Sequence, residues 1–472
     1  MSKRYIIGTR GSLLARGQAG LVARELKKLT GMDFDLKTIK TQGDLQTDKP
    51  LWQMEGRDFF SKELDSALRN EQVDLVVHSC KDLSWQRPSD FVLAAITERH
   101  YSPDILLVKK EVAANISSFK KITIGTSSLR RTANLKDSLS AFLPGHPEVN
   151  AVPIRGNVPT RIEKIHKGDY QGIVLALAGL ARLAEVEESR PVIEKLLASL
   201  DFMIMPESLF PGAAAQGALA LECLKKRKDL QKILSLLNHS DTRKEVDKER
   251  EALAGYGGRC HLAVGITVKK IREHFLHIHK GIWNEKKIYK KWLESPGKIS
   301  LSSPGFIGIP QKRMTDERFY YDFLLEKIPL DDVYTSREGN FFVASPYGIP
   351  ALKTIFKKGI IWTSGVSTMK KLVNEGLWVH GSVDSLGDKE IIEKKDSAVF
   401  RMLLGERPWK VLTCDSVDSS LGEVIGTYRR TIREPAGDRR DMMKRIKSFY
   451  WTSFYQYERY REFFPFIEEA RH

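Results

Sequence analysis

Residues 73–82 read Val-Asp-Leu-Val-Val-His-Ser-Cys-Lys-Asp, an apolar run that ends in polar and charged side chains. Val and Leu favour a strand buried on both faces, because bulky branched side chains suit a pleated surface. His78 and Ser79 then bring an imidazole and a hydroxyl to the strand's carboxyl end, and Lys81 and Asp82 add a cation and a carboxylate. Ligands of open α/β sheets bind beyond that end. A solvated turn with a local Lys–Asp pair has the same pattern, so this stretch alone leaves both interpretations open.

The residues before this stretch alternate between strand and helix patterns. Residues 5–9 predict a first strand, followed by a turn into a helix with Ser12 as its N-cap. Residues 34–39 predict a second strand, and a helix over about 61–69 leads back to the opening stretch. Residues 41–57 have no periodicity, and loops of this length in compact domains are typically mobile and functional. The order predicts a parallel or mixed sheet with helices on both faces.

A second group of strands is expected after a change of character at residues 97–104. These strands cover 122–125, 152–154 and 172–177. Arginines follow successive strand ends in both groups: Arg10, Arg130, Arg131, Arg155 and Arg161. Singly, each is best interpreted as a solvated surface cation. Together they predict a shared anion cleft, because a guanidinium pairs bidentately with a carboxylate, and hydroxyl-capped helix N-termini add positive charge.

The next segments predict a tight turn and a candidate nucleophile. Residues 211–218 are small and glycine-rich, and they are expected to feed a helix that extends to Cys223. A charged helix over about 242–254 leads to Cys260, which has an arginine before it and a histidine after it. Neighbouring cations lower a thiol pKa and favour the thiolate. An ordinary half-buried cysteine is the commoner alternative.

Composition bounds the class of protein. A chain of 472 residues is expected to hold roughly two to four domains. The net charge of +16 and the isoelectric point near 9.4 predict an anionic partner: nucleic acid, a membrane surface or a polyanionic substrate. Four scattered cysteines without C-x-x-C spacing argue against a zinc ribbon or disulfide framework. With no signal-peptide pattern and no membrane-spanning apolar run, we expect a cytoplasmic protein.

Taken together, the motifs resemble those of the porphobilinogen deaminase family, also called hydroxymethylbilane synthases. The resemblance runs in one order over about residues 4–265. Its motifs are T-R-G-S (9–12), Gly43-Asp44, F-x-K-E-L (60–64), V-H-S-x-K-D (77–82), G-T-S-S-L-R-R (125–131), R-G-N-V-x-T-R (155–161), A-G-L-x-R-L (178–183), Q-G-A (216–218) and the cysteine segment. This ordered set is specific, and it favours the functional interpretation of each feature above.

The resemblance implies an α/β fold with two periplasmic-binding-protein-like domains and a cleft, a small α+β third domain, and an extra α/β C-terminal region. The implied ranges are 1–100 with 213–238, then 101–212, 239–300 and 301–472. It also implies a transferase that joins four porphobilinogen molecules head to tail and releases hydroxymethylbilane. The implied cofactor is dipyrromethane, attached through a thioether to Cys260. We expect a monomer without nucleic-acid or membrane partners, because the substrate's carboxylates account for the basic composition.

The resemblance also implies roles for individual residues. Asp82 is the implied catalytic carboxylate. The implied cofactor-binding residues are Cys260, Lys81, Ser79, Ser128, Arg130, Arg131 and Asp44. The implied substrate-binding residues are Arg10, Ser12, Gln18, Arg155, Gly156, Arg161, Arg182, Gln216, Phe60 and Arg57. Loss of ammonia from porphobilinogen leaves positive charge on the pyrrole. A fixed carboxylate stabilises this charge and can accept protons from the pyrrole. The chain departs from the family pattern at Gln53, Arg57, Arg259 and Ala263.

The C-terminal third weakly resembles uroporphyrinogen-III synthase, which implies a degenerate or incomplete synthase-like domain that adds synthase activity, with an unrelated accessory domain as the alternative. A strand followed by a serine-led helix is expected near residues 341–346, 361–365 and 450–453, and residues 376–379 add a Gly-Leu-Trp-Val match. No catalytic residue can be assigned there, and the basic run 429–445 is expected to be a solvated helix face.

Two other functions remain as alternatives. The first is a non-catalytic binding protein on the same scaffold that senses a small carboxylate or a tetrapyrrole, motivated by Arg259 and Ala263. A nucleic-acid binder ranks below it, because the arginines follow strand ends rather than an exposed helix face.

Overall fold

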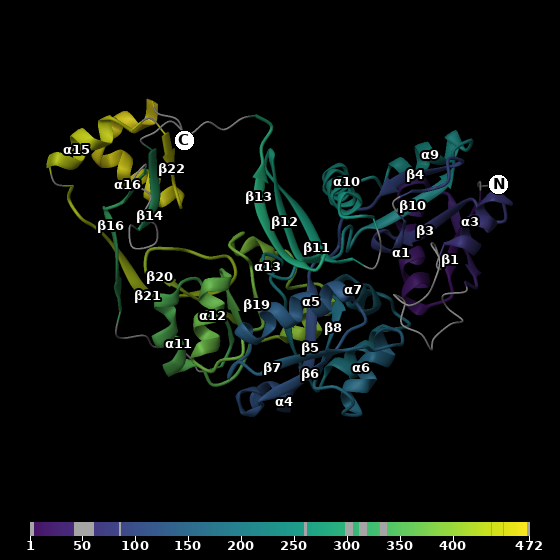
Figure 1. Ribbon diagram of the computed structural model, residues 1–472, viewed down its shortest axis with the longest axis horizontal. Helices are drawn as coiled ribbons and strands as arrows, with labels where there is room; N and C mark the ends of the chain where they lie inside the picture. Colours follow the sequence, from purple (N-terminus) through teal and green to yellow (C-terminus); the bar gives the residue numbers. More distant parts are fainter. Residues whose placement is uncertain are drawn as a thin grey trace. The chain divides into compact units, whose positions relative to one another are not determined.

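The computed structural model describes residues 4–41, 61–84, 86–258, 262–297, 305–310, 319–330, 338–435, 437–446 and 448–469. The chain forms two compact units (Figure 1). The first comprises Met1–Glu294 and Ile360–Pro408, and the second Ser295–Gly359 and Trp409–His472. The C-terminal region expected over 301–472 is therefore divided between the two units.

The first sheet of the first unit contains the opening stretch. Its strands are β1 (Arg4–Arg10), β2 (Asp33–Ile39), β3 (Leu75–Ser79), β4 (Phe91–Ile96) and β10 (Leu219–Leu224), in the order β2-β1-β3-β10-β4. β1 is parallel to β2 and β3, whereas β10 is antiparallel to β3 and β4. Helices α1 (Leu13–Thr30) and α9 (Lys228–Ser235) pack on one face, and α3 (Lys62–Arg69) packs on the other. Leu75 and Val77 of β3 accordingly contact the α1 side, and Val76 the α3 side.

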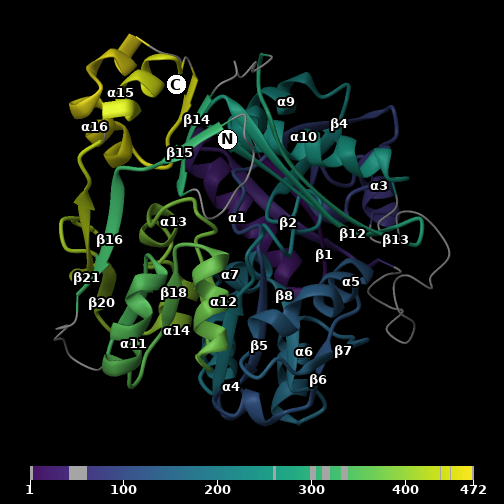
Figure 2. The ribbon, with the colours of Figure 1, turned by 60° about the vertical axis from the view of Figure 1, so that its left-hand side comes forward.

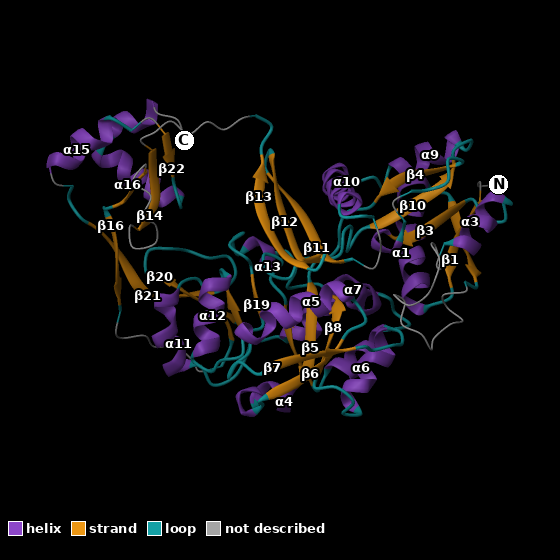
Figure 3. Ribbon diagram, viewed as in Figure 1, coloured by secondary structure: helices purple, strands orange, loops and turns teal. Residues whose placement is uncertain are grey.

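The second sheet repeats this topology. Its strands are β5 (Asp104–Lys109), β6 (Lys121–Gly125), β7 (Glu148–Val152), β8 (Gly172–Ala176) and β9 (Leu200–Ile204), in the order β7-β6-β8-β5-β9. Again three parallel strands are followed by two antiparallel pairings. The helices are α4 (Lys110–Ala114), α5 (Leu129–Ser138), α6 (Val158–His166), α7 (Leu177–Glu185) and α8 (Arg190–Leu197). The chain crosses between the sheets at 97–103 and 205–218, and the prediction of paired α/β domains is confirmed (Figure 3).

Several predicted elements need correction. The helix expected from residue 218 to Cys223 is strand β10, whose six residues are all buried between two neighbouring strands. A short apolar run is equally compatible with a buried strand or a helix, so its pattern could not decide. β3 begins at Leu75 rather than at residue 73, and β7 covers Glu148–Val152 rather than 152–154.

A three-stranded antiparallel sheet and a long helix follow in the first unit. Helix α10 (Ser240–Gly255) agrees with the helix predicted over 242–254. β11 (Ala263–Ile271), β12 (His274–Trp283) and β13 (Lys286–Glu294) form a meander in that order. The rest of this unit contains β18 (Ile361–Thr363), α12 (Val366–Asn374), β19 (Gly381–Ser382), α13 (Lys389–Ile392) and α14 (Ala398–Leu404) (Figure 2).

The second unit has its own strands and helices. A parallel sheet has the order β15 (Phe319–Asp322), β14 (Gly305–Pro310), β22 (Ser448–Tyr450). The strands β16 (Leu325–Pro329), β21 (Glu423–Ile432), β20 (Trp409–Cys414) and β17 (Asn340–Val343) are neighbours in that order. The helices are α11 (Ile349–Ile355), α15 (Gly437–Lys444) and α16 (Phe454–Phe463).

Two expectations for this region can be checked. Ser453 caps α16 by accepting a hydrogen bond from Gln456 N, so the serine-led helix near the chain's end is confirmed. The basic run 429–445 is not one helix face, because Arg429 and Arg430 lie on β21. Among the described helices, none has the length and apolarity that a bilayer span requires.

Candidate active site

The opening stretch places its polar residues at the edge of the first sheet. β3 lies between β1 and β10, so its backbone is held on both sides. A 3₁₀ turn over Cys80–Asp82 follows directly, and Cys80 N donates to Ala218 O at 3.1 Å. Cys80 is buried, whereas the Asp82 side chain is exposed. The turn therefore anchors itself through Cys80 and presents Asp82 outward.

A pocket of about 90 Å³ opens beside Asp82. Its polar lining consists of Arg10, Ser12, Gln18, Ser61, His78, Ser79 and Asp82. Ser79 Oγ donates to Gln18 Oε1 at 3.0 Å, and Ser12 Oγ caps α1 by accepting from Ala15 N at 3.2 Å. The structure thus brings four of the predicted ligand-binding residues around the predicted catalytic carboxylate. Whether they bind a ligand stays a prediction.

Lys81 connects this pocket to the second sheet. Its Nζ donates to Gln216 Oε1 at 3.2 Å, and Gln216 Nε2 donates to Asp104 Oδ1 at 2.9 Å and to Ser102 O at 2.7 Å. Burial lowers the pKa of Lys81 to about 8. The charges of Arg131 and Arg130 lower this pKa further, whereas those of Asp82 and Asp104 raise it. Gln216 is therefore a polar bridge between the ends of β3 and β5.

Asp104 pairs with both arginines of the G-T-S-S-L-R-R motif. Arg130 Nη1 donates to Oδ2 at 2.8 Å, and Arg131 makes a bidentate contact through Nε at 3.0 Å and Nη2 at 2.7 Å. All three residues are buried. Burial alone would raise the pKa of Asp104, but the two guanidinium groups hold that pKa below its usual range. Ser128 caps the helix that carries the arginines by accepting from Arg131 N at 3.4 Å.

A second arginine group follows β7. Arg155 has two buried guanidinium nitrogens, Nε and Nη2, without a hydrogen-bond partner among the described residues. Arg161 Nε donates to Gly156 O at 2.8 Å, and its pKa is lowered to about 10 by burial and by the charges of Arg131 and Arg155. Like charges that crowd together and leave buried donors unpaired are suited to an anionic ligand. Gly156 has φ 114°, where a side chain would also contact Thr160.

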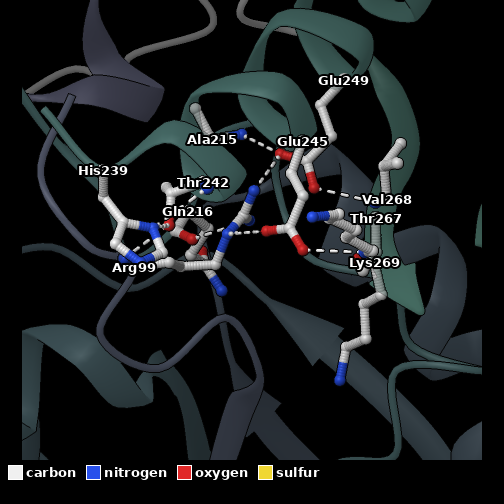
Figure 4. Close-up of polar contacts among 12 residues, drawn as sticks. Arg99, Ala215, Gln216, His239, Thr242, Glu245, Glu249, Thr267, Val268 and Lys269 are labelled. Carbon is white, nitrogen blue, oxygen red and sulfur yellow. Dashed lines mark hydrogen bonds and ion pairs between the residues drawn. The ribbon is translucent and has the colours of Figure 1, made fainter. Parts of the chain in front are cut away.

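The turn that holds Gln216 is fixed from several sides (Figure 4). Ala215, at φ 64°, donates its N–H to Glu249 Oε2 at 2.7 Å, and Arg99 Nη1 donates to Gln216 O at 3.2 Å. Arg182, predicted to bind substrate, is buried and donates through Nη2 to Gly217 O at 2.6 Å. Burial lowers the pKa of Arg182 to about 10. In the described structure Arg182 therefore supports the turn.

The sequence interpretation missed the acidic partners of these cations. Asp104 lies at the end of the predicted change of character at 97–104, and a charged residue at the start of an apolar strand is a signal for burial with a partner. Glu222, in the middle of β10, is fully buried and accepts from Arg87 Nε at 2.9 Å and Nη2 at 2.6 Å. Glu222 Oε2 also lies 3.4 Å from His78 Nε2. Arg87 thus pairs with a carboxylate that is buried behind the pocket.

Other predicted residues cannot be placed. Cys260, Asp44, Phe60 and Arg57 lie outside the described residues, as do Gln53 and Arg259. The cysteines that are described, Cys80, Cys223 and Cys414, are buried free thiols. Burial raises the pKa of Cys80 and that of Cys223 to about 11, which disfavours the reactive thiolate in both.

The two α/β domains thus bring a carboxylate and several arginines together at their strand ends. Residues 5–232 match the family model described as "Porphobilinogen deaminase, dipyromethane cofactor binding domain". The porphobilinogen deaminase of Lawsonia intracellularis is 36% identical over 56% of this chain and 79% of its own length. That of Listeria welshimeri is 34% identical over 63% and 93%. The chain belongs to the porphobilinogen deaminase family.

Two further comparisons concern another relative and a solved structure. The probable porphobilinogen deaminase of Methanocaldococcus jannaschii is 39% identical over 55% of this chain and 80% of its own length. Among solved structures, an extracellular-binding protein of a probable amino-acid ABC transporter from Bacillus subtilis is 14% identical and covers 55% of this chain and 94% of its own. Its TM-score is 0.28, which is too low to support an argument.

Proposed function

We propose that the chain is an active hydroxymethylbilane synthase, which condenses four porphobilinogen molecules and releases hydroxymethylbilane. The observation that supports this most directly is the placement of exposed Asp82 in a pocket with Arg10, next to Lys81 and its bridge to Arg130 and Arg131. One carboxylate and several cations at the meeting point of two domains match the needs of a substrate that carries carboxylates and becomes cationic as it reacts.

Asp82 has two tasks in this proposal. When the C–N bond of the aminomethyl group breaks and ammonia leaves, the substrate pyrrole becomes electron-poor and positively charged. The Asp82 carboxylate stabilises that charge through the pyrrole N–H, and it accepts and returns protons as the new bond forms. Exposure of Asp82 to the pocket keeps it accessible to each incoming unit.

The residues present fit a dipyrromethane cofactor. Nε and Nη2 of Arg155, which have no hydrogen-bond partner in the described part of the chain, and the remaining donors of Lys81 and Arg130 offer sites for its carboxylates. When bound, the cofactor supplies the pyrrole carbon to which the first unit adds. We assign its thioether to Cys260, and the burial of Cys80, Cys223 and Cys414 supports that choice.

Intact-mass measurement of the purified protein tests the assignment. We expect a covalent adduct with the mass of dipyrromethane, absent in Cys260→Ala and present in the matched control Cys414→Ala. An active protein of unmodified mass would contradict the proposal. Asp82→Asn, in which Cys260 is unchanged, should lose turnover.

The remaining expectations concern the alternative functions, the partners and the localisation. The non-catalytic binding protein is not favoured, because the relatives are named as deaminases. Substrate carboxylates account for the net charge of +16 without nucleic acid. We also propose a cytoplasmic monomer, which size-exclusion chromatography with light scattering can check. Synthase activity of the C-terminal region stays a proposal, and a product assay for uroporphyrinogen III decides it.

A further inference from the structure

Residues 360–408, here called the brace, lie beyond the part of the chain that the family model matches, yet they belong to the same compact unit as both sheet domains. The brace packs along β9, the edge strand of the second sheet. Ile204 N donates to His380 O at 2.8 Å, and Trp378 Nε1 donates to Phe202 O at 3.0 Å. The Phe202 and His380 rings lie 5.2 Å apart. The brace therefore covers an otherwise open sheet edge.

The brace also contacts the first connection between the domains, residues 97–103. Tyr101 OH donates to Ser397 Oγ at 3.0 Å, and the Tyr101 and Phe400 rings lie 5.6 Å apart. Lys394 Nζ lies 6.0 Å from the centre of the Tyr101 ring. Tyr101 and Phe400 are both buried, so this contact excludes water.

The second connection, residues 205–218, is held by Asp384 of the brace. Asp384 Oδ2 accepts from Ser208 N at 2.7 Å, and Oδ1 accepts from Ser208 Oγ at 2.5 Å. The neighbouring Glu207 pairs with Lys269 of β11 at 2.8 Å. Both oxygens of one carboxylate are thus used to fix a single residue of the connection.

Lys269 joins this contact electrostatically. Although burial works against its charge, three carboxylates hold the pKa of Lys269 above its usual value. They are Glu207, Glu390 and Asp384, and two of them belong to the brace. A cavity of about 60 Å³ lies between the brace and the two connections, lined among others by Pro103, Glu207, Trp362 and Val383. The contacts of the brace with both connections therefore surround this cavity, and its empty volume allows small shifts of the side chains that line it.

We propose that the brace sets the relative position of the two sheet domains during chain elongation, and that Asp384 is a positioning residue for the reaction. This inference rests on the proposed function. Asp82 and Arg10 come from the first domain and Arg155 and Arg161 from the second, so the spacing of the domains decides how substrate and chain end meet. Asp384 does not belong to the pocket, and it acts through Ser208 and the second connection.

The brace should matter most for the first addition. At that stage only the carboxylates of the proposed cofactor bridge the two domains, so the protein's own contacts contribute most to holding them at the reactive distance. Each added unit brings further carboxylates, which pair with cations of both domains and hold them together. Loosening the second connection should therefore slow the early additions and leave the late ones nearly unchanged.

The test resolves single additions by rapid quench and intact-mass measurement of enzyme that carries successive units. We expect Asp384→Ala to slow the first addition about three- to tenfold and the last by less than about twofold. Asp396→Asn is the matched control, because Asp396 is an exposed acid of the brace whose partner is its neighbour Lys395. Hydrogen exchange of residues 205–212 should rise in Asp384→Ala and not in the control.

The outcomes separate this inference from the proposed function. Equal step rates in Asp384→Ala and wild type overturn the inference, whatever the exchange shows, and so does a uniform slowing of all steps. Wild-type protein that carries no adduct and adds no unit overturns the proposed function, and the inference with it. If Asp384→Ala does not fold, Ser208→Ala removes the Oγ contact alone, and it should slow the first addition selectively by a smaller factor.

Discussion

Replacing Asp104 by asparagine should destabilise the protein strongly, because Asp104 is the shared counter-charge of Arg130 and Arg131. Its side chain is 2% exposed, and its two oxygens accept from three guanidinium nitrogens and from Gln216 Nε2. Asparagine conserves the shape but leaves two buried guanidinium groups without a negative partner. Breaking a buried pair in this way costs about 3–5 kcal/mol. That is a large fraction of the roughly 5–15 kcal/mol that stabilises a typical domain.

Urea unfolding of wild type and Asp104→Asn measures this cost as a difference in the free energy of unfolding. The matched control is Asp90→Asn. Asp90 pairs with Arg69 at 2.7 Å, but their side chains are 45% and 48% exposed. An exposed pair contributes about 0–1 kcal/mol. If Asp104→Asn costs no more than Asp90→Asn, the idea that Asp104 compensates the buried arginines is wrong.

The pH dependence supplies an independent check of the same cause. The folded-state pKa of Asp104 lies below its ordinary value of 3.8. Its stabilising effect is therefore fully present above that ordinary value, and it is lost as pH falls through the folded-state pKa. The difference in unfolding free energy between wild type and Asp104→Asn should stay constant from pH 7 to about 5 and shrink below 3.8. A difference that does not change with acidification would contradict a charge-based effect.

Three further predictions concern the site itself. Burial lowers the pKa of Lys81 to about 8, so the charge that pairs with the cofactor's carboxylates should be lost as pH passes 8; kcat/KM should then fall in wild type, and Lys81→Arg, which stays charged, should lack this fall. Asp82→Asn should lower kcat about 10²- to 10³-fold while substrate still binds, as seen by stopped-flow binding; a near-normal kcat would reassign the catalytic group. Gly156→Ala should destabilise the protein by more than Gly168→Ala in thermal unfolding. Both glycines have positive φ, but a Cβ at 156 would lie 2.8 Å from Thr160, whereas one at 168 meets nothing within 4 Å. Equal destabilisation would show that backbone strain alone decides the cost.

Much of the first sheet could be predicted from the sequence, because its signals are local. Along β2, polar and apolar residues alternate in the sequence. Ser12 before α1 and the run of charged residues in α10 are likewise patterns that extend over only a few residues. β10 could not be predicted in this way. Its six buried residues have no alternation, and it is a strand because β3 and β4 pair with it from distant parts of the chain.

The candidate site shows the same division between local and distant information. Asp82, Ser79 and Arg10 lie at strand ends, and a strand end predicts their position without knowledge of the rest of the chain. Asp104 and Gln216 depend on the two crossings between the sheets, which bring residues over 100 positions apart into contact. A pairing of that kind leaves no pattern in a single sequence.

The internal pairs also change what the arginine-rich cleft offers a ligand. Counting positive residues suggests an open basic surface, yet Arg130, Arg131 and Arg182 are buried and already donate to Asp104 or to backbone carbonyls. Without such partners, the free-energy cost of burying these guanidinium groups would exceed the free energy gained when a ligand binds them. The partners keep the guanidinium groups charged and correctly oriented in the absence of substrate, so a carboxylate that binds has to pair only with the donors that remain. We therefore expect the site to be preorganised by its own acids, so that, under the proposed function, its affinity for carboxylates depends on Asp104 as well as on the arginines.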